Sequence, residues 1–290
     1  MPTARLPVRA AAAAASAFLL VASLASCAQE STPTVASGTP TGDACANIST
    51  VTDGTLTVAT SNPAYPPYVL KNDPTNGKGF ESATAYAVAK EMGFTPDKVK
   101  WTFAPFGKLF APGDKDFDFA LNQISINPAR QRAVTFSEPY YDAPNAVLVL
   151  KDSAFASATT LADLQDAKIG VQTSTTAQTE VETSIAPTHD LAVYPSTSNA
   201  VEALKNHQID AFVTDLPTAL YLSAVEVSGD VIGLLPSDQA ASEWGLVLQK
   251  GNPLVSCVNQ ALTSLKDSGQ LQEITKQWMT DYVQAPPVLS

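Results

Sequence analysis

Residues 168–225, which decide the fold class, read KIGVQTSTTAQTEVETSIAPTHDLAVYPSTSNAVEALKNHQIDAFVTDLPTALYLSAV. Segments that predict strands and segments that predict helices take turns along this stretch. The order is strand at 168–172, helix at 176–185, strand at 191–194, helix at 198–206, strand at 209–213 and helix at 216–225. Strands that alternate with helices favour a parallel or mixed sheet with helices on both faces. We therefore expect an α/β fold.

The alternation continues on both sides of this stretch. Towards the N-terminus we expect strands at 56–59, 99–103, 117–121 and 146–150, and a helix at 80–92. Towards the C-terminus we expect a strand at 245–248 and helices at 253–266 and 271–282. A chain of 290 residues is too long for one compact core to be the default, so we expect two lobes. In such sheets ligands lie beyond the carboxyl ends of the strands.

The N-terminus has the pattern of an export signal. Arg5 and Arg9 are the only charged residues before Glu30, and an apolar, alanine-rich run follows them at 10–24. This run is too short and too rich in small residues to predict a membrane-spanning helix. No other apolar run in the sequence is long enough to span a bilayer.

Leu24-Ala25-Ser26-Cys27 follows the apolar run and resembles a bacterial lipobox, in which the cysteine is diacylated and becomes the mature N-terminus. The resemblance implies a signal peptide over 1–26, a lipid anchor at Cys27 and a place on the outer face of the cytoplasmic membrane. The alternative is an ordinary secretory signal with a chance cysteine. We expect residues 27–50 to be a flexible tether and N-terminal arm, because most of this segment is rich in Ser, Thr, Pro, Ala and Gly.

The composition is acidic, with 28 acidic and 17 basic residues and a net charge of −11. An acidic surface gains nothing from counterion release on a phosphate backbone, so we do not expect a nucleic acid as partner. The chain has two histidines, His189 and His207, which show no metal-ligand spacing and have no nucleophile motif beside them. We therefore expect neither a metal site nor a cofactor.

Five motifs follow one another along the chain. They are Asn62-Pro63-Ala64-Tyr65-Pro66-Pro67-Tyr68, Gly79-Phe80-Glu81, Asn122-Gln123-Ile124-Ser125-Ile126-Asn127-Pro128-Ala129-Arg130 (with Phe136-Ser137-Glu138-Pro139-Tyr140-Tyr141 after it), Gly170-Val171-Gln172-Thr173-Ser174-Thr175-Thr176, and Ile209-Asp210-Ala211-Phe212-Val213-Thr214-Asp215. In this order, over about residues 51–283, they resemble the family 3 extracellular solute-binding proteins of polar amino acid importers. Each motif is weak alone, but five in the right order and spacing are specific.

The resemblance implies a two-lobe, periplasmic-binding-protein-like (type II) clamp with two hinge strands, one near 146–150 and one near 243–246. It places 51–146 and 245–290 in the first lobe and 147–244 in the second. It implies a monomeric binding protein, not an enzyme, that captures a free amino acid and delivers it to the permease of an ABC importer with its ATPase. The lipid anchor would be its contact with the membrane.

Two charged residues occupy family positions that contact the ligand's own charges. Arg130 matches the carboxylate-binding arginine, and the planar guanidinium suits a carboxylate because it can make two parallel bonds. Asp215 matches the ammonium-binding aspartate and also has the position of an N-cap for the helix at 216–225. Without the resemblance, Arg130 would be interpreted as a solvated arginine, which is our interpretation of Arg132.

The remaining candidates are uncharged. Ser125 and Gln123 match positions that contact the ligand, Gln123 through its main-chain carbonyl, and Tyr65 and Phe106 match aromatics that pack on its side chain. Thr175 and Thr176 end the fourth motif, where Thr175 with Gln178 predicts a capping box.

Three positions qualify these expectations. The family usually has glycine where this chain has Ser174, which leaves the backbone approach there open. Asn62 stands where relatives that bind cationic side chains carry an acid, which favours a neutral or polar ligand. We interpret Glu81 as structural, because a negative charge at a helix start is favourable.

The cysteine count leaves one pair. If Cys27 is lipidated, Cys45 and Cys257 remain, and an even pair in an oxidising compartment suggests a disulfide, with two free thiols as the alternative. In the family both segments belong to the first lobe, so a bridge would fasten the N-terminal arm to it.

Two other functions remain open at this point. The fold has given rise to small-molecule dehydratases, and a ligand sensor that docks on a membrane signalling protein would carry the same motifs.

Overall fold

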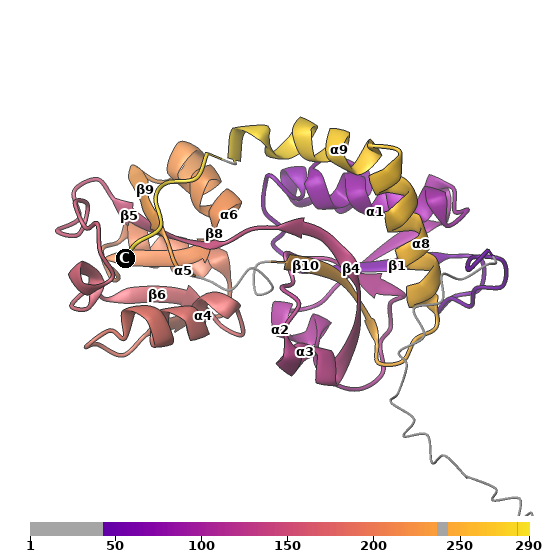
Figure 1. Cartoon of the computed structure of the whole chain (residues 1–290), viewed down its shortest axis with the longest axis horizontal. Helices are drawn as coiled ribbons and strands as arrows, with labels where there is room; N and C mark the ends of the chain where they lie inside the picture. The colour runs from indigo at the N-terminus through magenta and orange to yellow at the C-terminus, as the bar shows by residue number, and fades with distance from the viewer. Residues whose placement is uncertain (1–42, 237–242, 283) are drawn as a thin grey trace, which may run out of the picture. The chain divides into compact units, whose positions relative to one another are not determined.

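The computed structural model describes residues 43–236, 243–282 and 284–290. The expected α/β fold is confirmed: two five-stranded mixed sheets form two lobes, each covered by helices (Figure 1). The predictions of a signal peptide, of a lipid anchor at Cys27 and of most of the tether concern residues 1–42, which lie outside the described residues.

The first lobe is built on the sheet β2-β1-β3-β10-β4. Its strands are β1 (Leu56–Thr60), β2 (Val99–Phe103), β3 (Phe119–Ala120), β4 (Val134–Asp142) and β10 (Glu243–Gln249). β1 pairs in parallel with β2 and β3, while β10 runs antiparallel to β3 and β4. Its helices are α1 (Phe80–Glu91), α2 (Phe106–Leu109), α3 (Pro128–Ala133), α8 (Leu254–Asp267) and α9 (Gln270–Met279), with short 3₁₀ turns at 70–72, 74–76, 96–98 and 280–282.

The second lobe repeats this plan in the order β7-β6-β8-β5-β9. Its strands are β5 (Asn145–Leu150), β6 (Ile169–Gln172), β7 (Ala192–Tyr194), β8 (Ala211–Asp215) and β9 (Gly229–Leu234). β6 pairs in parallel with β7 and β8, and β5 runs antiparallel to β8 and β9. Its helices are α4 (Thr176–Glu180), α5 (Thr197–Lys205) and α6 (Leu216–Tyr221), with a 3₁₀ turn at 162–164.

Both faces of the second sheet are buried, as β5 shows. Ala146, Leu148 and Leu150 lie in the apolar cluster on one face, while Val147 and Val149 lie in the cluster on the other. Successive side chains of a strand point to opposite faces, so an unbroken apolar run fits a strand that is covered on both sides. This is why the sequence of β5 shows no polar alternation.

Two predicted helices change type before they end. Beyond α4 and α6 the chain continues as π-helical turns at Val181–Ile185 and Leu222–Glu226. The predicted spans 176–185 and 216–225 were therefore correct in length, but only their first halves are α-helical.

The chain crosses between the sheets earlier than expected. β4 belongs to the first sheet and β5 to the second, so the first crossing lies at Ala143–Pro144 and not within 146–150. The return crossing lies between β9 and β10.

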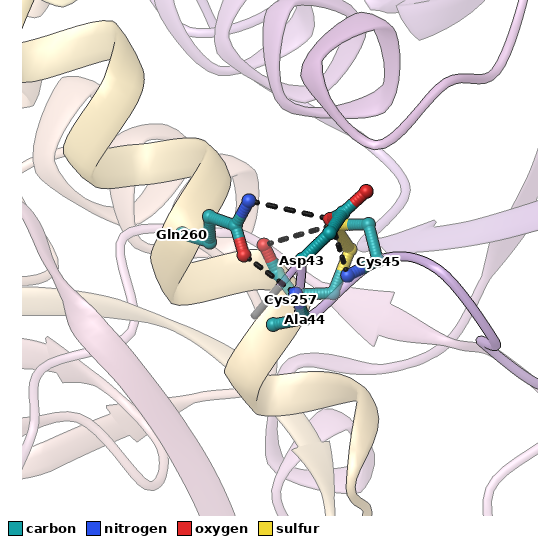
Figure 2. Close-up of a disulfide and its surroundings, with 5 residues drawn as sticks. All are labelled: Asp43, Ala44, Cys45, Cys257 and Gln260. Carbon is teal, nitrogen blue, oxygen red and sulfur yellow. Dashed lines mark hydrogen bonds between the residues drawn. A yellow bond between two sulfur atoms is a disulfide. The ribbon is translucent and has the colours of Figure 1, made fainter. Parts of the chain in front are cut away.

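A disulfide between Cys45 and Cys257 joins the N-terminal arm to α8 (Figure 2). Polar contacts surround it: the backbone N–H of Ala44 donates to Gln260 Oε1 at 2.8 Å, and that of Cys45 donates to Asp43 Oδ1 at 2.9 Å. Cys257 is buried in the main apolar cluster of the first lobe. The bridge therefore closes a span of 212 residues and fastens the start of the described chain to the first lobe.

The C-terminal tail contacts the second lobe, unlike our assignment of 245–290 to the first. The Leu289 N–H donates to Leu234 O at 2.9 Å, and the Leu234 N–H donates to Pro287 O at 3.0 Å. The Leu289 side chain is only 2% exposed and lies in an apolar cluster of the second lobe. A Cβ atom at Gly233 would lie 2.5 Å from this side chain, so glycine makes room for it. α8 and α9 pack on the first lobe as expected.

Among the described residues, no helix is both long enough and apolar enough to cross a bilayer.

Candidate ligand-binding site

A cavity of about 420 Å³ lies where strands from both sheets end. Its lining includes residues directly after β1, β2 and β3 of the first sheet and after β6 and β7 of the second, together with the end of β8. Parallel strands expose their carboxyl ends along one edge of a sheet, which is where α/β folds place ligands. The topology of the two lobes thus accounts for the position of the cavity.

All nine predicted ligand-binding residues line this one cavity. They are Asn62, Tyr65, Phe106, Gln123, Ser125, Arg130, Thr175, Thr176 and Asp215. Eight further polar residues of the lining were not among the predicted site residues, and they are Ser61, Asn122, Asn145, Gln172, Ser196, Thr197, Thr214 and Thr218. Among the described residues of the lining, Arg130 and Asp215 are the only ones with charged side chains.

The N-terminus of α3 holds Arg130 in place. Asn127 is the N-cap and accepts from the Arg130 N–H at 2.9 Å, and Pro128 takes the first helical position, where its missing N–H is not needed. The guanidinium carbon lies 4.3 Å from the ring centroid of Phe110 and 5.7 Å from that of Phe106. These rings bury the cation beside the cavity and attract it through their π-faces.

The Arg130 charge is desolvated but not paired with an acid. The residue is 7% exposed, and desolvation lowers the pKa of its guanidinium to about 10. Its Nη1 donates to Ser125 O at 2.7 Å and its Nη2 to Ser174 O at 2.8 Å. Neither ion pair of the described chain includes Arg130. A buried cation with only carbonyl and aromatic partners has a strong demand for an anion.

Ser174 reaches Arg130 from the second lobe with an unusual backbone. Its φ is 65°, in the left-handed region that glycine adopts most easily. This explains why glycine suits the position, and it shows that serine is accommodated there. Its Oγ would lie 3.2 Å from a Cβ atom at Gly107, so the small residue at 107 allows the close approach.

Asp215 is surrounded by hydroxyl and amide donors. As the predicted N-cap of α6 it accepts from the Thr218 N–H at 2.9 Å, and it also accepts from Thr218 Oγ1 at 2.9 Å and from Tyr68 Oη. Desolvation raises the pKa of its carboxyl, and these hydrogen bonds counteract part of that rise. No cation of the described chain pairs with Asp215, so its negative charge remains uncompensated.

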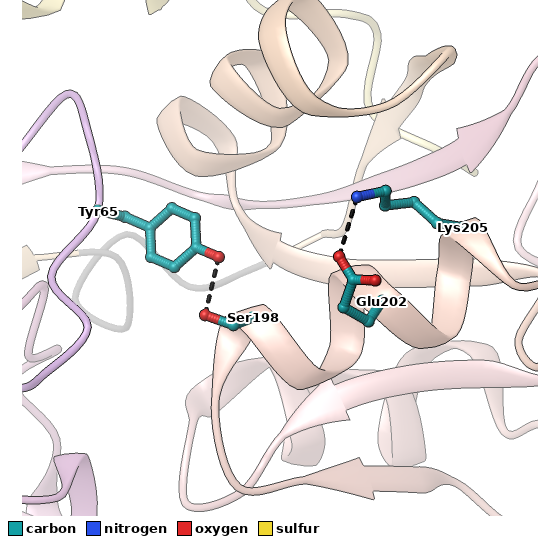
Figure 3. Close-up of polar contacts among 4 residues, drawn as sticks. All are labelled: Tyr65, Ser198, Glu202 and Lys205. Carbon is teal, nitrogen blue, oxygen red and sulfur yellow. Dashed lines mark hydrogen bonds and ion pairs between the residues drawn. The ribbon is translucent and has the colours of Figure 1, made fainter. Parts of the chain in front are cut away.

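Two tyrosines of the first lobe reach the second lobe. Tyr68 donates to Asp215, and the Tyr65 hydroxyl donates to Ser198 Oγ at 2.9 Å, next to the start of α5 (Figure 3). The ring of Tyr65 packs against an apolar cluster of the second lobe. Tyr65 therefore makes a contact between the lobes besides lining the cavity. The Glu202–Lys205 ion pair farther along α5 is solvent-exposed, so it contributes little to stability.

The predicted capping box at Thr175 does not form. Thr175 occupies the N-cap position of α4, but its hydroxyl donates backwards to Gln172 O at 2.7 Å. Gln178 instead donates to Glu182 at 3.4 Å. Thr176 accepts from Asn145 Nδ2 at 3.2 Å, and Asn145 also donates to Glu180 at 2.9 Å.

Hydrogen bonds fix the orientation of the Asn62 amide. The Ala64 N–H donates to Asn72 Oδ1 at 2.7 Å, so the Asn72 amide nitrogen must face Asn62, and it donates to Asn62 Oδ1 at 2.8 Å. The oxygen of Asn62 is therefore engaged, and its amide N–H groups are left as donors at the cavity. Such a group would bind an acceptor and would repel a cation.

Glu81 has a more specific structural role than the sequence interpretation gave it. It lies in the first turn of α1 as expected, but the residue is only 1% exposed and contacts Gln123, which lines the cavity. It accepts from the backbone N–H of Gln123 at 2.6 Å, from Gln123 Nε2 and from Tyr140 Oη. Gln123 itself has a φ of 49° and is thus held in a left-handed conformation. The second motif includes Glu81 but did not indicate this contact, because Glu81 is distant in sequence from Gln123.

The described residues hold no group of three or more His, Cys, Asp or Glu side chains that could bind a metal ion.

Comparison with known proteins places this geometry in a family. A family model described as "Bacterial extracellular solute-binding proteins, family 3" matches residues 56–281. The arginine-binding periplasmic protein of Mannheimia haemolytica is 30% identical over 75% of this chain and 88% of its own length. The L-cystine-binding protein TcyJ of Escherichia coli is 28% identical over 78% of this chain and 82% of its own.

A solved structure extends the likeness to three dimensions. An ancestral arginine-binding protein bound to glutamine matches with a TM-score of 0.67 and 30% identity, covering 78% of this chain and 98% of that chain.

Proposed function

Because this chain belongs to the bacterial extracellular solute-binding proteins of family 3, we propose that it captures a free amino acid in the cavity between its lobes and delivers it to an ABC importer. The relatives are named as binding proteins, so we assign the cavity a binding role and no catalytic step, which argues against the dehydratase alternative.

The single observation that carries the proposal is a pair of opposite, unpaired charges on one cavity. Arg130 comes from the first lobe and Asp215 from the second, and no side chain of the described residues neutralises either. A zwitterion supplies both missing partners, its carboxylate to Arg130 and its ammonium to Asp215. Since the two residues lie on different lobes, one ligand would hold the lobes together.

The other lining residues have supporting roles in this proposal. Ser125 and the main-chain carbonyl of Gln123 would complete the hydrogen bonds of the ligand's charged groups, with Thr175 and Thr176 on the opposite lobe. Phe106 and Tyr65 would pack on the ligand's side chain.

The charges of the lining favour a ligand with an uncharged side chain. Once Arg130 and Asp215 are paired with the α-groups, the part of the lining that the structure describes has no further charged residue for a charged side chain. A third charge on the ligand would be desolvated without a partner. The free amide donors of Asn62 fit a polar, acceptor-bearing side chain. Small polar or neutral amino acids are therefore the proposed ligands.

We propose that Cys27 anchors the protein by its acyl chains to the outer face of the cytoplasmic membrane and that the protein acts as a monomer. The support is the order of charge, apolar run and small residues before Cys27. Cys27→Ala should move the protein from the detergent phase to the aqueous phase in phase partitioning, or leave it unprocessed. Unchanged partitioning of the variant would rule out the anchor.

Thermal unfolding with each of the twenty proteinogenic L-amino acids tests the proposed function. A ligand at about 100 times its Kd stabilises the native state by about 2.7 kcal/mol, which raises the melting temperature by several degrees. We expect such a shift with one or a few uncharged amino acids and none with arginine or lysine. The absence of any shift across the panel would refute amino acid capture.

A further inference from the structure

The side chains of Asn122, Gln123 and Glu81 form a chain of hydrogen bonds that begins in the cavity lining and whose direction is fixed at one end. The Ser61 N–H, at the end of β1, can only donate, and it donates to Asn122 Oδ1 at 3.0 Å. The Asn122 amide nitrogen therefore faces Gln123, and donates to Gln123 Oε1 at 2.8 Å. The Gln123 amide nitrogen must then point the other way, towards Glu81, which it contacts.

Glu81 thus receives only donors. It accepts from the Gln123 side chain, from the Gln123 backbone N–H at 2.6 Å and from the Tyr140 hydroxyl. An ionised carboxylate offers acceptors to all of them. A protonated carboxyl would face a donor at the oxygen that contacts the Gln123 amide nitrogen. At the other oxygen its O–H could be accepted only by the Tyr140 hydroxyl, which would then lose the bond that it donates. Reversing the Gln123 amide would not relieve this conflict, because the bonds from Ser61 through Asn122 set its orientation.

The same bonds hold a backbone conformation that the cavity uses. Gln123 has a positive φ of 49°, which is unfavourable for a residue with a side chain and persists only when its surroundings impose it. Glu81 binds both the backbone N–H and the side chain of this residue. Ser61, Asn122 and Gln123 all line the cavity.

We propose that Glu81 is a positioning residue for the bound amino acid, whose ionised carboxylate fixes Gln123, Asn122 and Ser61 in the geometry that binds the ligand. The inference rests on the proposed function, and it adds that capture depends on the ionisation of a group that does not itself line the cavity.

The groups around Glu81 bring this ionisation close to neutral pH. Desolvation raises the pKa of Glu81 to about 7, although the bonds from Tyr140 and Gln123 lower it, and the charge of Asp215 at the end of β8 raises it further. Tyr68 and Tyr140, the other titratable neighbours, keep their protons because burial raises the pKa of both well above its usual range.

The sign of the pH dependence follows from these neighbours. A ligand ammonium beside Asp215 would offset the charge that raises the pKa of Glu81, so the liganded form binds the proton at Glu81 less tightly. Affinity is then greatest above pH 7 and falls as the pH drops below 7.

Two measurements on the full-length protein test the proposal. In the unliganded protein, the Gln123 backbone amide should shift in nitrogen-15 NMR spectra with a midpoint near pH 7. Calorimetry with each of the twenty L-amino acids, one at a time, should show affinity falling several-fold from pH 8 to pH 6 for those that bind.

Glu81→Gln should abolish the pH-dependent shift of the Gln123 backbone amide signal. It should also place the amide nitrogen of the new side chain against an N–H donor of Gln123. Affinity at pH 8 should fall about tenfold, equivalent to about 1.4 kcal/mol, and should no longer change between pH 8 and pH 6. Glu91→Gln is the matched control, because Glu91 is an exposed residue of the same helix, and it should leave both readouts unchanged.

If Glu81→Gln fails to fold, Tyr140→Phe replaces it. This variant removes one hydrogen bond that lowers the pKa of Glu81, so the midpoint of the Gln123 amide should move to higher pH. The proposal is overturned if wild-type protein binds an amino acid but Glu81→Gln binds it with the same affinity and pH profile, or if the Tyr140→Phe midpoint does not move. Wild-type protein that binds no amino acid would instead refute the proposed function.

Discussion

The first lobe presents a cation to the cavity and the second lobe presents an anion, and the two charges are held in opposite ways. Arg130 is desolvated by Phe106 and Phe110 and bonds only to carbonyl groups. Asp215 accepts hydrogen bonds from Thr218 on its own lobe and from Tyr68 on the other.

This difference indicates a division of roles between the two charges. The cation lacks strong partners, so the ligand's carboxylate contributes the larger share of affinity at Arg130. The anion is already satisfied by hydrogen bonds, so the ammonium adds to an existing set of donors and its contribution is smaller.

Arg130→Ala should have the largest effect, because it leaves the ligand's carboxylate unpaired in a desolvated site. Loss of one partner of such a pair costs about 2 to 5 kcal/mol, so affinity should fall roughly 30-fold or more in calorimetry. Arg130→Lys should recover part of it only, since an ammonium lacks the bidentate fork. Arg132→Ala, exposed on the same helix, should change little. If Arg130→Ala bound the ligand with wild-type affinity, the larger contribution that we assign to Arg130 over Asp215 would be contradicted.

The two ends of the described chain are attached to different lobes by different means. The Cys45–Cys257 disulfide attaches the N-terminal arm to the first lobe, whereas packing of Leu289 attaches the C-terminal tail to the second. Replacing Cys45 and Cys257 by serine should lower the free energy of unfolding by about 2 to 5 kcal/mol, mainly by freeing the unfolded chain. Denaturant unfolding of the oxidised protein and the double variant measures this. Ligand affinity should persist in the variant, since neither cysteine lines the cavity. Equal stability of the two proteins would contradict the prediction.

Leu289→Ala tests the packed end of the second lobe. The side chain is buried and leaves a cavity when it is shortened, so we expect a loss of about 2 kcal/mol of unfolding free energy. Val288→Ala is the control, because Val288 is exposed and should alter stability by less than about 0.5 kcal/mol. A similar loss for both variants would show that the tail matters as a whole and not through Leu289.

Tyr65→Phe should have the smallest effect. It removes the hydrogen bond to Ser198 but keeps the ring that packs on the second lobe. A single neutral hydrogen bond contributes about 0.5 to 1.5 kcal/mol, so affinity should fall by a few-fold, through faster dissociation in stopped-flow measurements. An unchanged dissociation rate would mean that this contact does not hold the lobes together.

Local patterns explain why the fold was predictable, whereas the nine lining residues were predicted from the resemblance of five motifs to a family. The apolar runs of β1, β5 and β8 and the N-cap at Asp215 depend on neighbours in sequence. β4 was not predicted, because Glu138 and Pro139 interrupt its pattern. It forms because β10 pairs with it across two register shifts around Gly245, where an irregular ladder accommodates proline.

What the sequence could not show depends on contacts between distant segments. Glu81 meets Gln123 only when the fold brings the start of α1 to the segment after β3. The tail reaches β9 only after α9 has passed over the first lobe (Figure 1). The capping box predicted at Thr175 does not form, because the Thr175 hydroxyl donates to Gln172 O, three residues earlier.

Calorimetric titration with two matched probes decides whether Arg130 and Asp215 bind one zwitterion. The first probe is the L-amino acid that gives the largest thermal shift, and the second is the same molecule with its α-ammonium replaced by hydrogen. We predict that the wild type prefers the amino acid by about tenfold or more, that Asp215→Asn removes most of this preference, and that Arg130→Ala weakens both probes alike. Equal preference for the amino acid in wild type and Asp215→Asn would show that Asp215 does not bind the ammonium.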